Sequence, residues 1–152
     1  MEVSLSLALP RDGLSVPVAR RLLRQSLDAL GVQDSVTSDI EIALTEACTN
    51  VLDHAADGDE YEVRAAIHGT ECVIEVVDTG QGFDDERHGF GDAASGAESG
   101  RGIQLMRALV DRVSFNHRGD GTVVYLEKRL SWVEGAPLER LAGVARPSGA
   151  ER

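Results

Sequence analysis

The stretch Tyr61-Glu-Val-Arg-Ala-Ala-Ile-His-Gly-Thr-Glu-Cys-Val-Ile-Glu-Val-Val-Asp78 decides the fold. Apolar and polar side chains alternate from Tyr61 to Ile67, which predicts a half-buried strand. The residues His68-Gly-Thr-Glu71 have the composition of a hairpin turn, and residues 72–77 form a second, more uniformly apolar strand. Two strands joined by so short a turn predict antiparallel pairing.

The segments on either side of this hairpin add further strands and three helices. Apolar residues recur at helical spacing in the helices, and we expect Ser15 to be the N-cap of the first helix and Gly31 to end it. The last two strands are joined by the turn Arg118-Gly-Asp-Gly121. The expected strands are 3–9, 61–67, 72–77, 113–117 and 122–130, and the expected helices are 16–30, 35–55 and 102–109.

This order of elements predicts the fold class. Strands that come mostly as hairpin pairs imply a mixed, largely antiparallel sheet. Three amphipathic helices can cover only one face of such a sheet. We therefore predict an α/β fold of the α+β kind, a two-layer sandwich with its helices on one face, which differs from the doubly wound dinucleotide folds.

The length of the chain favours one domain. At 152 residues it can bury one core and is too short for two ordinary ones. We place this domain at residues 1–130. The tail 131–152 is rich in Gly, Ala, Pro and Arg, and we expect it to be flexible with at most one helical turn near residues 138–141. Residues 80–99 hold five glycines and almost no large aliphatic side chain, which is typical of a long, lid-like loop.

The charge balance excludes several classes of partner. Against 15 basic side chains the chain has 26 acidic ones, for a net charge of −11, so its surface repels nucleic acid and anionic lipid. A nucleotide site would have to rely on backbone N–H groups and a metal ion. No signal peptide or membrane-spanning stretch is evident, and we interpret the two cysteines, Cys48 and Cys72, as buried, reduced thiols. A cytoplasmic location is expected.

Glu46 and Asn50 are candidate functional residues on the second helix. They are four positions apart, so their side chains lie along one face. The Asn50 carbonyl oxygen is a hard ligand suited to Mg²⁺. A carboxylate one turn away can deprotonate an attacking hydroxyl or water. The alternative interpretation is an ordinary solvated face of an amphipathic helix.

A second candidate motif is Asp78-Thr-Gly-Gln-Gly82, directly after the buried strand. An acid at this position needs hydrogen-bond donors, and the amino group of a ligand is one such donor. Gly80 and Gly82 allow the backbone to approach a flat ring closely. An ordinary turn at the end of a strand would have the same composition.

The third motif is Gly100-Arg-Gly102, which opens the third helix. Free N–H groups and the positive end of the helix dipole favour an anion here. Arg101 either adds charge to this site or is simply solvated. A flexible connector is the alternative interpretation of a glycine-rich helix start.

In this order, the three motifs resemble those of the GHKL ATP-binding family, which includes gyrase, the ninety-kilodalton heat-shock chaperone, histidine kinases and mismatch-repair ATPases. The resemblance covers residues 3–130. It implies that Asn50 holds Mg²⁺ on the ATP phosphates and that Glu46 is the general base. It also implies that Asp78 accepts a hydrogen bond from the adenine amino group.

The same resemblance implies roles for the glycines. Gly80 and Gly82 would shape the base pocket, and residues 83–99 would be the ATP lid. The phosphates would meet the N–H groups of Gly100, Arg101 and Gly102. Thr122, in Gly-Thr-Val-Val, matches the strand threonine near adenine.

Within that family the chain looks most like the small bacterial anti-sigma-factor serine/threonine kinases. This similarity implies a homodimer that uses ATP and Mg²⁺, sequesters a sigma factor and phosphorylates a small anti-sigma-factor antagonist. Two alternatives stay open. One is a catalytically silent module whose nucleotide-ordered lid controls a protein interface, and the other is stand-alone ATP hydrolysis.

Overall fold

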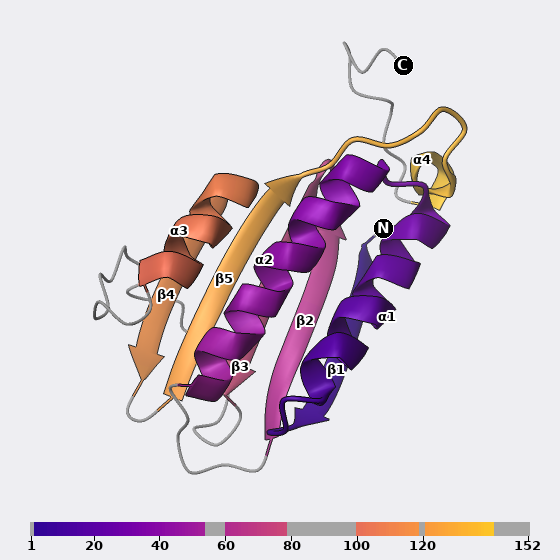
Figure 1. Cartoon of the computed structure of the whole chain (residues 1–152). Coiled ribbons are helices and arrows are strands. Elements are labelled where there is room, and N and C mark those ends of the chain that lie inside the picture. The colour runs from indigo at the N-terminus through magenta and orange to yellow at the C-terminus, as the bar shows by residue number, and fades with distance from the viewer. Residues whose placement is uncertain (1, 54–59, 79–99, 119–120, 142–152) are drawn as a thin grey trace.

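The protein is a two-layer sandwich of one sheet and a layer of helices (Figure 1). The structure is a computed structural model and describes residues 2–53, 60–78, 100–118 and 121–141. The elements in chain order are β1 (Val3–Pro10), α1 (Ser15–Leu30), α2 (Asp34–Asp53), β2 (Glu60–His68), β3 (Glu71–Asp78), α3 (Gly100–Leu109), β4 (Arg112–Arg118), β5 (Gly121–Arg129) and α4 (Pro137–Leu141).

The sheet has the strand order β1-β2-β3-β5-β4, and every neighbouring pair of these strands is antiparallel. The predicted hairpin is confirmed, because β2 and β3 pair from Tyr61 opposite Asp78 to His68 opposite Glu71. Strand β5 lies between β3 and β4, so β4 forms an edge although it precedes β5 in the chain. The predicted fold class is confirmed as well.

Alternation along the strands separates a buried face from a polar one. Val63, Val76 and Val124 stand opposite one another on three adjacent strands, and each is at most 2% exposed. Helix α2 packs against β3 and β5 and contributes fully buried Ile40 and Leu44 to the same core. Burying one aliphatic side chain of this size stabilises the fold by about 1.5–3 kcal/mol. The helical layer therefore covers one face, as predicted.

The neighbouring row of side chains faces the other way. Arg64 stands opposite Glu75, and Glu75 stands opposite Tyr125. All three are partly exposed, and Arg64 also forms an ion pair with Glu62 at 2.8 Å. This face of the sheet carries the polar half of the alternation.

The start of α1 differs from the expected N-cap. The N-cap residue is Leu14, and no side chain caps it, whereas Ser15 is already helical and only 6% exposed. The Ser15 hydroxyl lies 2.6 Å from the Tyr61 hydroxyl and donates to the Asp12 carbonyl at 2.7 Å. The predicted cap is wrong because the buried Tyr61 hydroxyl, from a distant strand, competes for the serine oxygen.

The end of α1 is as predicted, and a glycine is required there for two reasons. Gly31 has φ of 86°, a left-handed conformation that L side chains rarely adopt. A Cβ on Gly31 would also lie 2.4 Å from the Cβ of Ala136. The C-terminal segment therefore lies directly on this helix end.

Residues 131–141 pack against the domain, although flexibility was predicted from residue 131. Trp132 and Leu138 are fully buried. The Trp132 indole donates to Glu139 Oε1 at 3.1 Å, and the Val133 amide donates to the Gly31 carbonyl at 2.9 Å. The predicted helical turn is present as α4. Residues 142–152 lie outside the described residues.

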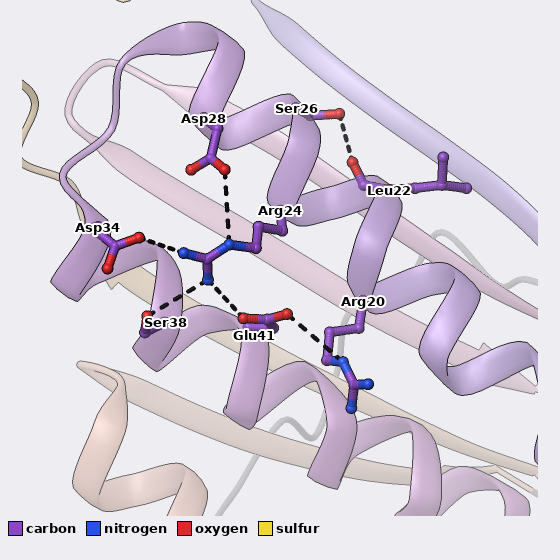
Figure 2. A network of polar contacts seen from close by, with 8 residues as sticks. All are labelled: Arg20, Leu22, Arg24, Ser26, Asp28, Asp34, Ser38 and Glu41. Carbon is purple, nitrogen blue, oxygen red and sulfur yellow. Dashed lines mark hydrogen bonds and ion pairs between the residues drawn. The ribbon is translucent and has the colours of Figure 1, made fainter.

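An ion network joins α1 to α2 (Figure 2). Arg24 of α1 contacts Glu41 at 2.7 Å and also pairs with Asp34, both on α2. It bonds further to Asp28 of its own helix, while Arg20 approaches Glu41 at 3.6 Å. This network lies along the helix pair and involves none of the predicted site residues.

Candidate functional site

The last turns of α2 carry the predicted acid and amide. Asn50 is 9% exposed, and Glu46, one turn earlier, is partly exposed. The opposite side of this part of the helix belongs to the core, because Ala47, Cys48 and Val51 are fully buried. Glu46 and Asn50 therefore share a face that borders the core and reaches solvent at Glu46.

The start of α3 lies against this face. Helices α2 and α3 pack together, and a Cβ on Gly102 would come within 3.0 Å of Glu46 Oε1. Any larger residue at position 102 would therefore push against the Glu46 carboxylate. Gly100 and Arg101 form the first turn of the same helix, and Arg101 is exposed. The structure thus brings together two of the three motifs that sequence analysis singled out.

Asp78 and Thr122 occupy adjacent ends of β3 and β5. Val77 is paired with Val123 in the antiparallel register, so Asp78 and Thr122 follow at the same end of the two strands. Both are 2% exposed. A buried carboxylate and a buried hydroxyl are costly unless they are hydrogen-bonded, and both residues do make polar interactions.

Arg11 connects Asp78 to the end of α2, and sequence analysis did not find it. Its Nη1 lies 3.1 Å from Asp78 Oδ2, and the two side chains are 9% and 1% exposed. Its Nη2 donates to the carbonyl oxygens of Val51 and Leu52 at 3.2 and 3.4 Å. These carbonyls belong to the last described turn of α2. An arginine in a turn after a strand gives no local signal that it will be buried.

The remaining predicted positions are not described. Gly80, Gly82 and the lid residues 83–99 lie outside the described residues. The described parts of the site therefore come from α2, the start of α3, the ends of β3 and β5, and the turn after β1 (Figure 1).

The two thiols are not candidates for nucleophilic chemistry. Burial raises the pKa of Cys48 from its ordinary 9.0 to about 12, against a smaller opposing effect of a hydrogen bond with Tyr61. Burial alone raises the pKa of Cys72 to about 12. Both thiols are free and buried, so they stay protonated at neutral pH, and the thiolate is the reactive form.

The donor set fits a metal that is bound mainly through phosphates. Among the described residues no three His, Cys, Asp or Glu side chains lie together as a metal site. Mg²⁺ keeps several waters and is held by one or two protein oxygens plus phosphates, so a single Asn50 carbonyl suits it. Gly100 and Gly102, at the start of α3, have no side chain to cover the first N–H groups of the helix, which lack partners within it and suit an anion.

Comparison with known proteins defines the class. A family model for the histidine kinase-like ATPase domain matches residues 9–128. Because this range covers most of the chain, the chain belongs to the histidine kinase-like ATPase family, the GHKL family that the motifs resemble. Membership in this family implies ATP binding.

Individual relatives show which members of this family the chain resembles. Serine-protein kinase RsbW of Halalkalibacterium halodurans is 30% identical over 136 residues, which cover 84% of this chain and 83% of the relative. Serine-protein kinase RsbW of Bacillus subtilis is 28% identical over 127 residues, which cover 76% of this chain and 79% of the relative. The predicted resemblance to small anti-sigma-factor kinases is thus confirmed at the level of homology.

A solved structure shares the fold. The RsbU and RsbW domains of Rv1364c from Mycobacterium tuberculosis match with a TM-score of 0.65 at 24% identity, over 84% of this chain. The match spans about a third of that longer protein, 32% of its chain. In the part of our chain that the structure describes, no helix has the length and apolar composition needed to cross a membrane.

Proposed function

We propose that the protein is an ATP-dependent serine/threonine protein kinase that phosphorylates a small anti-sigma-factor antagonist and sequesters a sigma factor. The observation that carries this proposal is the contact between Glu46 and the glycine start of α3, with Asn50 one helical turn away. This contact puts a carboxylate beside the N–H groups suited to the phosphates. Homology to serine-protein kinases supports the same conclusion.

Each predicted site residue would have its own role in nucleotide binding or phosphoryl transfer. Asp78 would accept a hydrogen bond from the adenine amino group. Thr122 lies at the end of β5 next to Asp78 at the end of β3. The N–H groups of Gly100, Arg101 and Gly102 bind phosphate oxygens, and Asn50 holds Mg²⁺. Bound Mg²⁺ neutralises phosphate charge. Phosphoryl transfer then depends mainly on positioning and electrostatics.

Glu46 would act as the general base. It accepts the proton of a serine or threonine hydroxyl while the hydroxyl oxygen attacks the γ-phosphorus of ATP, and the bond to the β-phosphate oxygen breaks. The partial exposure of Glu46 suits this role, because a protein substrate must reach the carboxylate from solvent. Gly80, Gly82 and the lid 83–99 would complete the nucleotide pocket.

A phosphorylation assay tests the proposal. The protein is incubated with labelled ATP, Mg²⁺ and a candidate antagonist, and Glu46→Gln is compared with Glu41→Gln, a change in the ion network of the same helix. We expect Glu46→Gln to lose at least a hundredfold in rate with little change in ATP affinity, and Glu41→Gln to keep its activity. Normal transfer by Glu46→Gln would show that the base assignment is wrong.

The partners follow from the same proposal. We infer a cytoplasmic homodimer that binds either the antagonist or the sigma factor, and no nucleic acid directly, which agrees with the net charge of −11. Pull-down from the native host with and without ATP identifies both partners. ATP binding with no phosphorylated partner would instead favour the silent regulatory module.

A further inference from the structure

The strongest unexplained feature of the site is the buried guanidinium of Arg11. A buried charge is expensive, and this one has three separate contacts. They are Asp78 Oδ2 at 3.1 Å, the Val51 carbonyl at 3.2 Å and the Leu52 carbonyl at 3.4 Å. The contact with Asp78 is an ion pair and not a directed hydrogen bond, because Arg11 Nη1 makes no hydrogen bond among the described residues.

The contacts join two parts of the site that are far apart in the chain. One nitrogen meets the acid at the end of β3, and the other satisfies carbonyls at the end of α2, directly after Asn50. The guanidinium is planar and rigid, so both contacts are fixed relative to each other. Because the guanidinium attracts Oδ2 from one fixed side, it favours one orientation of the carboxylate, and with it one direction in which Oδ1 accepts.

We propose that Arg11 is a positioning residue that orients the Asp78 carboxylate and thereby sets the preference for adenine over guanine nucleotides. The inference rests on the proposed role of Asp78 at the adenine amino group. An ionised carboxylate only accepts hydrogen bonds. Adenine offers an amino donor at its 6-position, whereas guanine has an oxygen acceptor there, which a fixed carboxylate repels.

The base preference distinguishes positioning from support of the fold. Loss of fold support lowers the affinity for every nucleotide by the same factor, whereas loss of orientation lowers the affinity for ATP more than that for GTP. The readout is therefore the ratio of the two dissociation constants, measured by calorimetry with Mg²⁺ present. Arg24→Gln is the matched control, because it removes a partly exposed arginine whose ion pairs join α1 to α2 away from the site (Figure 2).

For Arg11→Gln we expect ATP to bind about tenfold more weakly and the preference for ATP over GTP to fall at least fivefold. For Arg24→Gln the preference stays within twofold of the wild-type value. An unchanged preference in Arg11→Gln overturns the proposal. If Arg11→Gln does not fold, Arg11→Lys is the test, because one ammonium group cannot contact both Asp78 and the carbonyl groups of Val51 and Leu52. Its preference should fall at least threefold, and an unchanged ratio overturns the proposal.

A double variant separates this inference from the proposed function. If Arg11 acts through Asp78, then Arg11→Gln should have no further effect on the ATP to GTP ratio in an Asp78→Asn background. A further fivefold change there overturns the positioning role. If Asp78→Asn alone leaves ATP affinity unchanged, the adenine pocket itself is wrong. If Asp78→Asn weakens ATP binding while Arg11→Gln keeps the ratio, only the inference about Arg11 fails.

Discussion

At the scale of single residues, the site depends on the absence of a side chain as much as on charged groups. Gly102 is the clearest example, because the nearest atom to its virtual Cβ is Glu46 Oε1 at 3.0 Å. Its place in α3 is ordinary helix, so a larger residue here is limited by the space beside Glu46 and not by backbone conformation. By contrast, Gly13 has open space around it.

Gly102→Ala should reduce phosphoryl transfer without unfolding the protein. The added methyl displaces the Glu46 carboxylate, whereas alanine favours a helix over glycine by about 1 kcal/mol. We expect the rate to fall at least tenfold and the melting temperature to stay the same or rise. Gly13→Ala is the control, and wild-type activity in Gly102→Ala would contradict the contact.

Thr37→Val should be neutral or stabilising. Thr37 is fully buried on α2, and its hydroxyl has no hydrogen-bond partner among the described residues. Valine has the same shape and removes the desolvation cost of the hydroxyl, so we expect a gain of about 0–1 kcal/mol in the free energy of unfolding. Urea denaturation measures this change in the free energy of unfolding. A loss above about 1 kcal/mol would mean that the hydroxyl is hydrogen-bonded.

At the scale of elements, the positions of the strands agree closely with those predicted from the sequence. The contacts between distant elements were not predicted. Alternation of side chains predicts the hairpin of β2 and β3 because one face is buried and the other is polar. Helical spacing of the apolar residues predicts the faces of the helices in the same way, and Glu46 and Asn50 were therefore expected on one face of α2. Element starts shifted by a residue or two, with α2 beginning at Asp34 in place of 35 and α3 at Gly100 in place of 102, whereas the predicted end of α2 at residue 55 lies outside the described residues.

The errors have a common cause in long-range contacts. The hydroxyl of Ser15 meets Tyr61, 46 positions away, and Arg11 reaches Val51, 40 positions away. Local patterns contain no information about such pairs. The segment after β5 was predicted to be flexible from its average composition, although two large apolar residues, Trp132 and Leu138, suffice to anchor it.

Trp132→Ala should show how much this segment contributes. The side chain is fully buried and its indole bonds to Glu139, so we expect a loss of about 3–5 kcal/mol in the free energy of unfolding. Val133→Ala is the matched control, because Val133 is 49% exposed and should cost little. Urea denaturation compares them. Equal stability of the Trp132→Ala variant and the wild type would mean that the segment is not part of the core.

At the scale of the whole molecule, the buried thiols make stability depend on alkaline pH. The pKa of Cys48 and of Cys72 is about 12 in the fold and 9.0 ordinarily, so the native state holds both protons more tightly. Between these values the unfolded chain releases protons that the native protein keeps. The contribution of the two thiols to the free energy of unfolding is therefore constant below about pH 8 and falls as the pH rises above about 9.

Each thiol should contribute a slope of about 1.4 kcal/mol per pH unit in this window. Urea midpoints from pH 8 to 11 measure the slope. Cys72→Val should make it shallower, whereas Val133→Ala, which changes no titratable group, should leave it unchanged. An identical slope in wild type and Cys72→Val would contradict the buried, protonated thiol.

The strand order also governs what happens while the protein is being synthesised. The first 78 residues contain β1, β2 and β3, but β3 receives its second neighbour only when β5 has emerged, about 50 residues later. At about 5–20 residues per second, ribosomes leave the edge of this apolar strand open for about 3–10 s. Nascent chains on the same messenger RNA are close together during that interval, and such edges pair with one another. Slower initiation of translation, which spaces the ribosomes, should therefore raise the soluble yield more than slower elongation, which lengthens the exposure.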